Sequence, residues 1–193
     1  FKKKTWVDWQ EKFLERFSKT DKDIEIDRIL RSDFPRARMD YLIGMKRSGN
    51  HAISNWIIQN TFESLVHINN ATDKIPDSWH VFSVEWINPK MLDRIICTFE
   101  HVEIDQYQPL EPTVIARDPY NWLASWISHT HFEHSKADRD IRCYINNIKN
   151  SKKIINYNSW FESLEYRNKI AHEMGFANQD LGVDSVLSFG KGS

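Results

Sequence analysis

The sequence predicts an α/β fold with a central, mainly parallel sheet flanked by helices. From Met39 onward, short segments rich in isoleucine, valine, phenylalanine and tyrosine alternate with longer stretches of helical periodicity. This alternation is typical of a parallel sheet that is covered on both faces. Two of the apolar segments, within 41–58 and 113–127, also run directly into a helical pattern through basic and small polar residues. Junctions of this kind, at the carboxyl ends of strands, are where α/β proteins hold phosphate groups.

The α/β pattern begins at residue 39, and the residues before it differ from the rest. Strands are expected over 39–44, 80–86, 93–99, 113–117 and 153–157. Helices are expected over 50–62, 119–130, 137–149 and 159–174. We therefore assign 1–38 to an N-terminal helical extension and 39–193 to one α/β domain, because a chain of 193 residues is long enough for one core.

The extension contains two predicted segments. Trp6, Trp9, Phe13 and Phe17 recur at helical spacing, which favours a helix that docks its aromatic face on the domain. Three lysines precede this helix, so a helix that binds a membrane interface or a partner is the alternative. The highly charged stretch 20–38 is expected to hold a second helix and a solvated connector.

Composition argues against several classes of function. The formal net charge of -1 provides no overall field that would attract nucleic acid. No apolar run is long enough to span a membrane, so no integral membrane segment is expected. Two cysteines, Cys97 and Cys143, fit a reducing compartment, and we expect a cytoplasmic protein in which both are small buried side chains. Because the chain starts at Phe1, a removed leader or anchor is left open, as is the oligomeric state.

The first junction has the outline of a phosphate-binding loop. Gly44 and Gly49 have the glycine spacing of a Walker A loop, GxxxxGK[ST], but Asn50 and His51 replace its lysine and its serine or threonine. In that loop the lysine bridges the terminal phosphates of ATP and the hydroxyl holds Mg²⁺. What remains is a tight turn that presents Arg47 and backbone N–H groups at the positive end of a helix. An ordinary glycine turn between a strand and a helix is the alternative.

The second junction is suited to a second anionic group. Asp118 and Pro119 form an N-cap and first-turn pair, so a helix begins directly after Arg117. Ser125 lies seven residues past Asp118, on the same helix face and about 10 Å further along. Arg117 and Ser125 can therefore bind one phosphate together, the arginine as a fork and the serine as a single donor. A surface Arg–Asp pair and a serine packed in the helix are the alternative.

Together, the two junctions resemble those of sulfotransferases that use 3′-phosphoadenosine 5′-phosphosulfate (PAPS). The segment GMKRSGNHA is similar to the loop that binds the 5′-phosphosulfate in this family, and RDPYNWLAS is similar to its 3′-phosphate motif, RDPxDxxxS. The order and separation of the two motifs also agree, and the resemblance covers most of 39–193. It implies a three-layer P-loop-like fold, PAPS as the donor, adenosine 3′,5′-bisphosphate (PAP) as the product, and no metal.

By this resemblance, the donor is held at both of its ends. Arg117 and Ser125 bind the 3′-phosphate, and the closing FGKGS resembles the start of a loop that covers this phosphate, which implicates Lys191 and Gly192. Arg47 takes the place of the catalytic cation of the loop. The residues implicated at the 5′-phosphosulfate are Lys46, Arg47, Ser48, Gly49, Asn50 and His51.

The family places a general base, a histidine or a glutamate, at the end of a strand that precedes the 3′-phosphate motif. Here RIICTFEH ends such a strand, which makes Glu100 and His101 the candidates. If the strand alternates regularly from Ile96 through Thr98, Glu100 shares their face and His101 lies on the other, which favours Glu100. The expected reaction is in-line transfer of a sulfuryl group to a hydroxyl or amine of a small-molecule or glycan acceptor.

Two other functions are left open. A P-loop kinase-like phosphotransferase would share the fold, although the loop has neither the lysine nor the Mg²⁺ ligand. A non-catalytic nucleotide-binding module would keep the fold and lose the chemistry. A metal site on His129, His131, His134 and Glu133 is not expected, because only His129 and Glu133 have the helical i, i+4 spacing.

Overall fold

The computed structural model describes residues 25–45, 47–61, 64–69, 78–82, 92–100, 111–128 and 134–185. Within these residues the chain is an α/β protein whose mainly parallel sheet is flanked by helices, as the sequence predicts. Several predicted features lie outside them: the aromatic helix of the extension, His129, His131 and Glu133, and the site residues Lys46, His101, Lys191 and Gly192.

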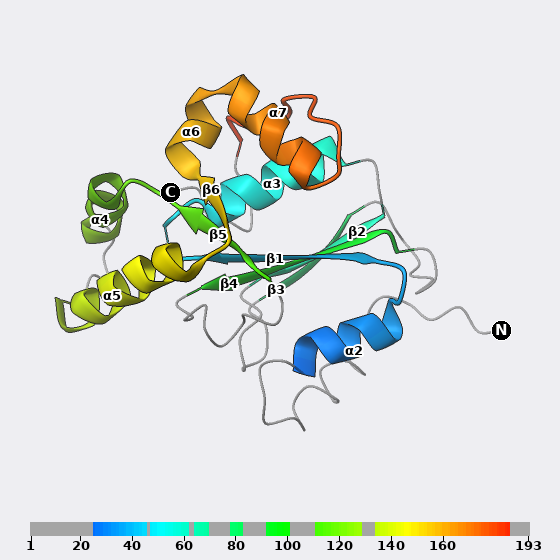
Figure 1. Cartoon of the computed structure of the whole chain (residues 1–193), viewed down its shortest axis with the longest axis horizontal. Helices are drawn as coiled ribbons and strands as arrows, with labels where there is room; N and C mark the ends of the chain where they lie inside the picture. Colours follow the sequence, from blue (N-terminus) through cyan, green and yellow to red (C-terminus); the bar gives the residue numbers. More distant parts are fainter. Residues whose placement is uncertain are drawn as a thin grey trace.

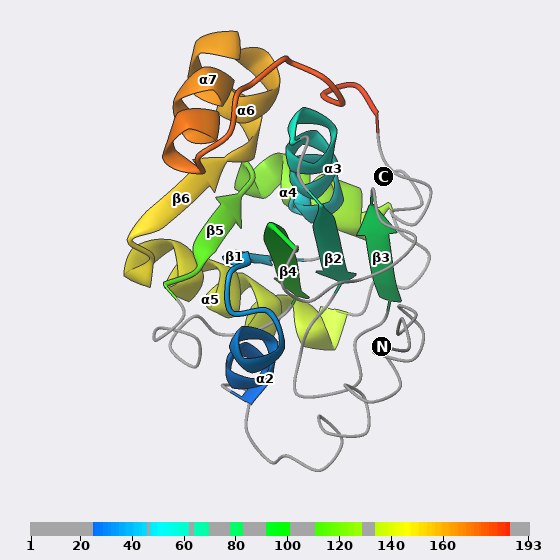
Figure 2. The same ribbon diagram turned by 90° about the vertical axis from the view of Figure 1, so that its right-hand side faces the viewer.

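The described strands form one six-stranded sheet with the order β3-β2-β4-β1-β5-β6. The strands are β1 (Arg38–Gly44), β2 (Leu65–Asn69), β3 (Ser78–Phe82), β4 (Arg94–Glu100), β5 (Thr113–Ala116) and β6 (Lys153–Asn156). All neighbours run parallel except β3, which pairs antiparallel with β2 at one edge. Figure 2 shows the strands in this order from β6 to β3.

Helices cover both faces of the sheet and give three layers. They are α2 (Glu25–Asp33), α3 (Asn50–Asn60), α4 (Pro119–Ile127), α5 (His134–Asn150), α6 (Tyr157–Glu162) and α7 (Leu164–Glu173). In Figure 1, α3, α6 and α7 lie above the sheet, α2 and α5 lie below it, and α4 lies beyond the carboxyl end of β1. No helix in the described ranges has the length and apolarity needed to cross a bilayer.

The main core lies between the sheet and the upper helices. Leu42, Ile96 and Ile115 come from neighbouring strands and pack against α3 and α7, all with 1% exposure or less. Trp56 of α3 and Trp160 of α6 are fully buried there, with ring centroids 5.9 Å apart in an edge-on arrangement. Burial of aromatic rings of this size dominates core energetics, which anchors α3 to the sheet. Both cysteines are free and buried, as predicted.

Local sequence signals set the helix starts. Asp118 accepts hydrogen bonds from the N–H groups of Tyr120 and Asn121, and Pro119 occupies the first turn of α4. Asn156 and Ser163 cap α6 and α7 in the same way. Because side-chain caps satisfy N–H groups that have no partner within a helix, these residues begin each helix where it does.

The structure corrects two element predictions. The strand β2 was not expected, since only three of its five residues are apolar and His67 and Asn69 interrupt the apolar pattern. Of the strand predicted at 80–86, residues 80–82 belong to β3, which begins at Ser78, and 83–86 lie outside the described residues. The helix predicted over 159–174 is two helices, because Ser163 has an extended backbone with φ of -119° and caps the second one. The other predicted strands and helices occur with end shifts of up to three residues.

The strand order reverses between β1 and β5. After β1 the chain crosses to β2 on one side, whereas after β5 it crosses to β6 on the other side. In open α/β sheets, ligands bind outside the carboxyl ends of the strands at such a reversal. Both predicted phosphate-binding junctions, β1–α3 and β5–α4, lie at this point.

Candidate functional site

The two junctions meet in space. Arg117, which follows β5, donates a hydrogen bond from Nη1 to the backbone carbonyl of Arg47 in the loop after β1, over 3.0 Å. The two residues are 70 positions apart in the sequence. The contact arises because β1 and β5 are parallel neighbours, with Gly44 in register with Ile115. The predicted anion-binding residues of both motifs therefore share one edge of the sheet.

The loop after β1 is braced from inside by its own side chains. Asn50 is buried, donates from Nδ2 to the carbonyl of Gly44 over 3.3 Å, and accepts from the hydroxyl of Ser48 over 3.2 Å. Gly44 allows this packing, because a Cβ there would lie 1.8 Å from Oδ1 of Asn50. The side chains of Ser48 and Asn50 thus hold the shape of the loop, and the groups this leaves for an anion are the backbone N–H groups.

The start of α3 has the electrostatics of an anion site. Its N-cap is Gly49 with φ of 104°, and within the described residues no side chain caps the helix and no acidic residue lies in its first turn. The helix dipole and the first N–H groups therefore present positive charge. This feature contrasts with α4, α6 and α7, each of which carries a side-chain cap.

Arg47 is strained and incompletely bonded. Its φ of 72° is in the left-handed region, which is unfavourable for a residue with a Cβ. Its Nε is buried and has no hydrogen-bond partner among the described residues. A buried donor without a partner costs free energy in the fold. Backbone strain and an unused donor at one residue are typical of a ligand-binding position, which makes Arg47 a candidate for one.

The Arg117 peptide is held by Tyr144 of α5. The Tyr144 hydroxyl accepts from the N–H of Arg117 over 2.6 Å and donates to its carbonyl. Tyr144 is buried, stacks on Trp122 of α4 with ring centroids 5.2 Å apart, and thereby joins both helices to the junction. Burial raises the pKa of Tyr144 to about 12, so the hydroxyl keeps its proton over the physiological range.

A third junction, between β6 and α6, lies beside the first two; the sequence predicted this strand and helix but not their place in the site. The ring of Tyr157 lies under the guanidinium of Arg117, 5.2 Å from its Cζ, and Asn158 accepts from the N–H of Asp118 over 3.1 Å. Sequence reasoning missed Tyr144 and Tyr157 as site residues. Tyr157 could have been found, since it follows a strand just as Arg117 does.

The remaining predicted residues lie around these junctions. Ser125 is half-buried on α4, and its carbonyl accepts from Ser128. Glu100 ends β4 in register with Gly44 and lies on the face of Ile96 and Thr98, as regular alternation requires. His51 is half-buried on the first turn of α3, and its Nε2 lies 3.1 Å from Oδ1 of Asn69 at the end of β2.

The segment 176–185, which we call the C-terminal strap, runs along α3 toward this site. Near its start, Asn60 accepts from the N–H groups of Gln179 and Leu181, and further on Asn55 donates to the carbonyls of Gly182 and Ser185. Because Asn55 lies closer than Asn60 to the amino end of α3, the strap leads the chain toward the phosphate loop.

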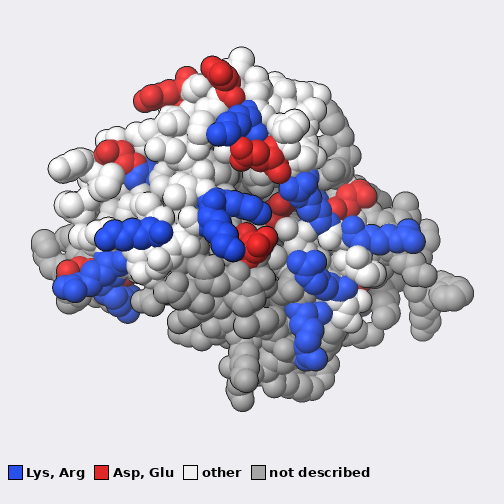
Figure 3. All heavy atoms as spheres, viewed as in Figure 1, with Lys and Arg blue, Asp and Glu red and all other residues white. Residues whose placement is uncertain are grey.

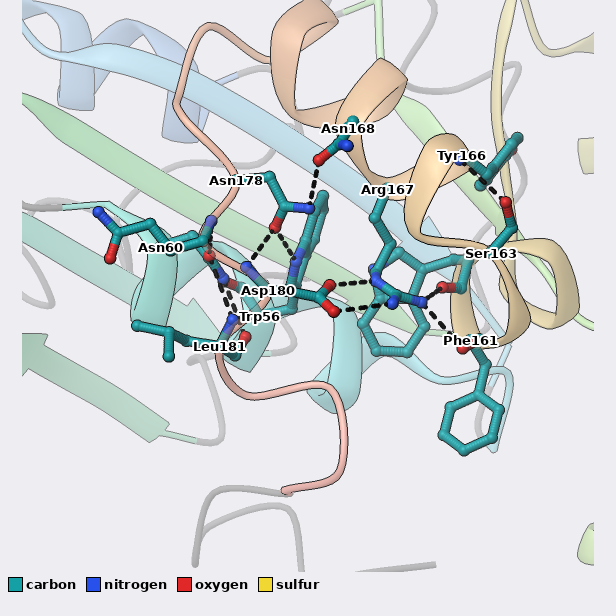
Figure 4. A network of polar contacts seen from close by, with 12 residues as sticks. Trp56, Asn60, Phe161, Ser163, Tyr166, Arg167, Asn168, Asn178, Asp180 and Leu181 are labelled. Carbon is teal, nitrogen blue, oxygen red and sulfur yellow. Dashed lines mark hydrogen bonds and ion pairs between the residues drawn. The ribbon is translucent and has the colours of Figure 1, made fainter.

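An ion pair fixes the strap to α7. Arg167 binds Asp180 with both Nε and Nη2, at 2.5 and 3.0 Å, and its Nη1 donates to the carbonyls of Trp160 and Phe161 (Figure 4). Trp56 donates from its indole nitrogen to Asn178 over 3.0 Å. The strap is therefore a packed part of the fold as far as Ser185.

A cavity of about 660 Å³ lies at the opposite edge of the sheet, beside the amino ends of β1, β5 and β6. Its lining carries charges of both signs, from Arg31, Arg38, Lys152, Lys153, Asp40, Glu111 and Glu173. Figure 3 shows basic and acidic side chains interspersed over the face that it presents. The lining extends along the strands as far as Tyr41 and Ile155, but it includes none of Arg47, Arg117 and Tyr157, so the cavity is not part of the candidate site.

Comparisons with protein-family models, with curated proteins and with solved structures give no match. The function of this chain is therefore argued from the site.

Proposed function

We propose that the protein is a PAPS-dependent sulfotransferase, which moves a sulfuryl group to a hydroxyl or amine of a small-molecule or glycan acceptor. One observation carries the proposal: the hydrogen bond from Arg117 to the carbonyl of Arg47 joins the two motifs that would hold the two ends of the donor. The Arg117 side chain, the Arg47 backbone and the helix start at Gly49 lie at the strand-order reversal, which supports the proposal. A nucleotide with phosphates at both its 3′ and 5′ positions matches this pair of anchors.

The protein groups have separate tasks in this reaction. The N–H groups at the start of α3 bind the 5′-phosphosulfate, and Arg47 meets the negative charge that develops on the departing phosphate oxygen. Arg117 and Ser125 hold the 3′-phosphate, and Tyr144 fixes the peptide that carries Arg117. Preorganised groups of this kind accelerate transfer because they need no rearrangement as charge develops. The P-loop-like fold predicted from the sequence is part of this proposal.

The loop argues against a kinase. Asn50 stands at the position of the Walker lysine, and its amide is bonded to Gly44 and Ser48 inside the loop. His51 stands at the position of the hydroxyl that would hold Mg²⁺, and its Nε2 contacts Asn69. Neither residue supplies the groups by which a P-loop lysine and hydroxyl bind Mg²⁺–ATP.

The test is a thermal-shift comparison of PAP with ADP plus Mg²⁺. A ligand at a hundredfold excess over its Kd stabilises the fold by about 2.7 kcal/mol. We expect a shift with PAP, and a fall in PAP affinity of about 10- to 100-fold in Arg117→Ala, which loses a charge-assisted contact. Arg142→Ala is the matched control, because Arg142 is an exposed arginine of α5 paired only with Asp138 in the described structure. A larger shift with ADP and Mg²⁺ than with PAP would overturn the proposal.

A further inference from the structure

We propose that the acceptor binds over the carboxyl ends of β4 and β2, and that Nδ1 of His51 takes the proton of its hydroxyl, with Asn69 and Thr98 as positioning residues. The inference rests on the proposed function and deepens it. It also differs from the sequence-based expectation, in which the base was Glu100 or His101 and His51 contributed to donor binding.

The polar contacts of His51 define its orientation. Nε2 of His51 lies 3.1 Å from Oδ1 of Asn69, and the hydroxyl of Thr98 donates to the same Oδ1 over 3.2 Å. An amide oxygen only accepts hydrogen bonds, so Nε2 of His51 carries the proton. A neutral imidazole has one N–H, and the lone pair therefore lies on Nδ1.

The groups that orient His51 belong to the sheet. Thr98 is fully buried, and its hydroxyl also lies 3.4 Å from the carbonyl of Ile68 and from Nε2 of His67. Thr98 and Asn69 come from neighbouring parallel strands, with Ile68 in register with Cys97. Buried polar groups that contact one another in this way favour one arrangement of the side chains. The tautomer of His51 is thus set by the sheet rather than by solvent.

The strand order separates the two substrates. β4 and β5 are the neighbours of β1 on its two sides. Arg117 follows β5, which places the 3′-phosphate anchor on that side, whereas Asn69, Thr98 and the His51 contact lie on the side of β4 and β2. A donor that reaches from Arg117 to the loop after β1 therefore leaves the β4 side for the acceptor. In-line attack requires this opposition of acceptor and leaving group.

Glu100 points to the class of acceptor. It lies in register with Gly44 and on the same strand face as Thr98, two residues beyond it. A carboxylate at this position accepts a hydrogen bond from a second hydroxyl next to the one that reacts. We therefore expect a polyhydroxylated acceptor, such as a sugar, in preference to an isolated hydroxyl.

The transfer step is balanced without a metal or a redox partner. The lone pair on Nδ1 takes the proton of the acceptor hydroxyl while the hydroxyl oxygen forms a bond to sulfur. The bond between sulfur and the bridging oxygen breaks, and its electron pair leaves with PAP, beside Arg47. The ring of His51 then carries two N–H groups. The Nε2–H group still donates a hydrogen bond to Oδ1 of Asn69, and this bond stabilises the imidazolium cation.

The first experiment measures the tautomer directly and needs neither donor nor acceptor. In the full chain labelled with ¹⁵N-histidine, His51 is assigned from its absence in His51→Gln. We expect a protonated Nε2 and an unprotonated Nδ1 at neutral pH. Asn69→Asp, which keeps the acceptor oxygen, retains this tautomer, and Asn69→Leu loses it. A protonated Nδ1 in the unsubstituted protein would overturn the inference.

The second experiment separates base catalysis from donor binding. Transfer from PAPS is measured to methyl glucoside, whose hydroxyls are weakly acidic, and to 4-nitrophenol, whose hydroxyl ionises readily. His51→Gln is expected to slow transfer to the glucoside by about 10²- to 10⁴-fold and transfer to the phenol much less, with the PAP thermal shift unchanged. Equal effects on both acceptors, or none, would exclude His51 as the base. If PAP gives no thermal shift in the unsubstituted protein, the proposed function is contradicted instead. The tautomer of His51, which is measured without PAP, does not depend on that outcome.

Discussion

The ring of Tyr157 lies directly against the backbone of Gly49, so that a Cβ added at Gly49 would be 2.2 Å from Cδ2 of the ring. The same ring also lies against the guanidinium of Arg117, whose Cζ is 5.2 Å from the ring centroid. Tyr157 therefore connects the phosphate loop after β1 to the arginine after β5, and it does so from the start of α6. The close approach explains why a glycine stands at position 49, in addition to its φ of 104°.

Gly49→Ala is expected to destabilise the fold and to weaken PAP binding. The positive φ alone costs on the order of 1–3 kcal/mol for a residue with a side chain. The clash with Tyr157 adds to this cost and displaces the loop N–H groups. Urea unfolding measures the first effect and the PAP thermal shift the second. Tyr157→Ala should cost less stability in the Gly49→Ala background than in the unsubstituted protein, since only there does it also remove the clash. An equal cost in the two backgrounds would show that the ring contact is unimportant.

Tyr144→Phe tests how Arg117 is positioned. The substitution removes the hydroxyl that bonds both the N–H and the carbonyl of Arg117, and it leaves the stacking on Trp122 in place. We expect a loss of about 1–3 kcal/mol in unfolding free energy, because two backbone groups lose their partner. PAP affinity should also fall, although Tyr144 does not touch the ligand. Unchanged PAP affinity would mean that Arg117 keeps its position without the hydroxyl.

The raised pKa of Tyr144 predicts that the protein loses stability at alkaline pH. Burial raises the pKa of Tyr144 from its ordinary value of 10.0 to about 12 in the folded state. The folded state therefore binds the proton more tightly, so the stabilising contribution is complete below pH 10.0 and is lost as the pH rises toward about 12. Unfolding free energies measured across this window should fall more steeply for the unsubstituted protein than for Tyr144→Phe. Parallel curves would contradict the prediction.

The sequence predicted the parts of the site that depend on chain order. The meeting of Arg47 and Arg117 follows from two strand-to-helix junctions in one parallel sheet, because the carboxyl ends of such strands share an edge. Likewise, the position of Glu100 follows from strand alternation. These two predictions need only the spacing of apolar residues and the order of strands and helices. Both can be read from short stretches of the sequence.

The parts that the sequence did not predict depend on tertiary packing. Tyr144 lies in the middle of α5, and nothing in its neighbours indicates that its hydroxyl bonds the Arg117 peptide. The Asn50 side chain turns inward and bonds the carbonyl of Gly44. This is one of several side-chain rotamers that the same loop sequence allows, so the sequence does not predict it. The strand β2 escaped notice because His67 and Asn69, which interrupt its apolar pattern, lie close to the hydroxyl of Thr98 on β4. Polar residues that satisfy one another inside a core weaken the pattern from which a strand is recognised.

The strap that leads toward the site is expected to loosen in acid. The hydrogen bond from Arg167 lowers the pKa of Asp180 below its ordinary value of 3.8. The stability that this pair contributes is therefore present above pH 3.8 and is lost as the pH falls through the lower folded pKa. The difference in unfolding free energy between the unsubstituted protein and Asp180→Asn should shrink over that range. Asp184→Asn, at an exposed aspartate of the same strap, is the control. A difference that does not depend on pH would contradict the prediction.

A buried ion pair lies remote from the site. Arg94 is fully buried, bonds Asp40 over 2.6 Å and donates to the carbonyl of Met174 over 3.1 Å. Asp40→Asn leaves the arginine charge without its carboxylate, which costs about 3–5 kcal/mol in comparable buried pairs. Asp138→Asn breaks the exposed pair with Arg142, with side chains 78% and 74% exposed, and should cost less than about 1 kcal/mol.

Urea unfolding of the two variants, with PAP binding measured at low temperature, checks both halves of this prediction. Asp40 lies near the amino end of β1, whereas the phosphate loop follows Gly44 at its carboxyl end. Folded Asp40→Asn should therefore bind PAP with the affinity of the unsubstituted protein, because the loop and Arg117 keep their contacts. Equal stability of the two variants would show that Asp40 does not neutralise Arg94. A loss of PAP affinity in the folded Asp40→Asn protein would show that the two ends of β1 are coupled.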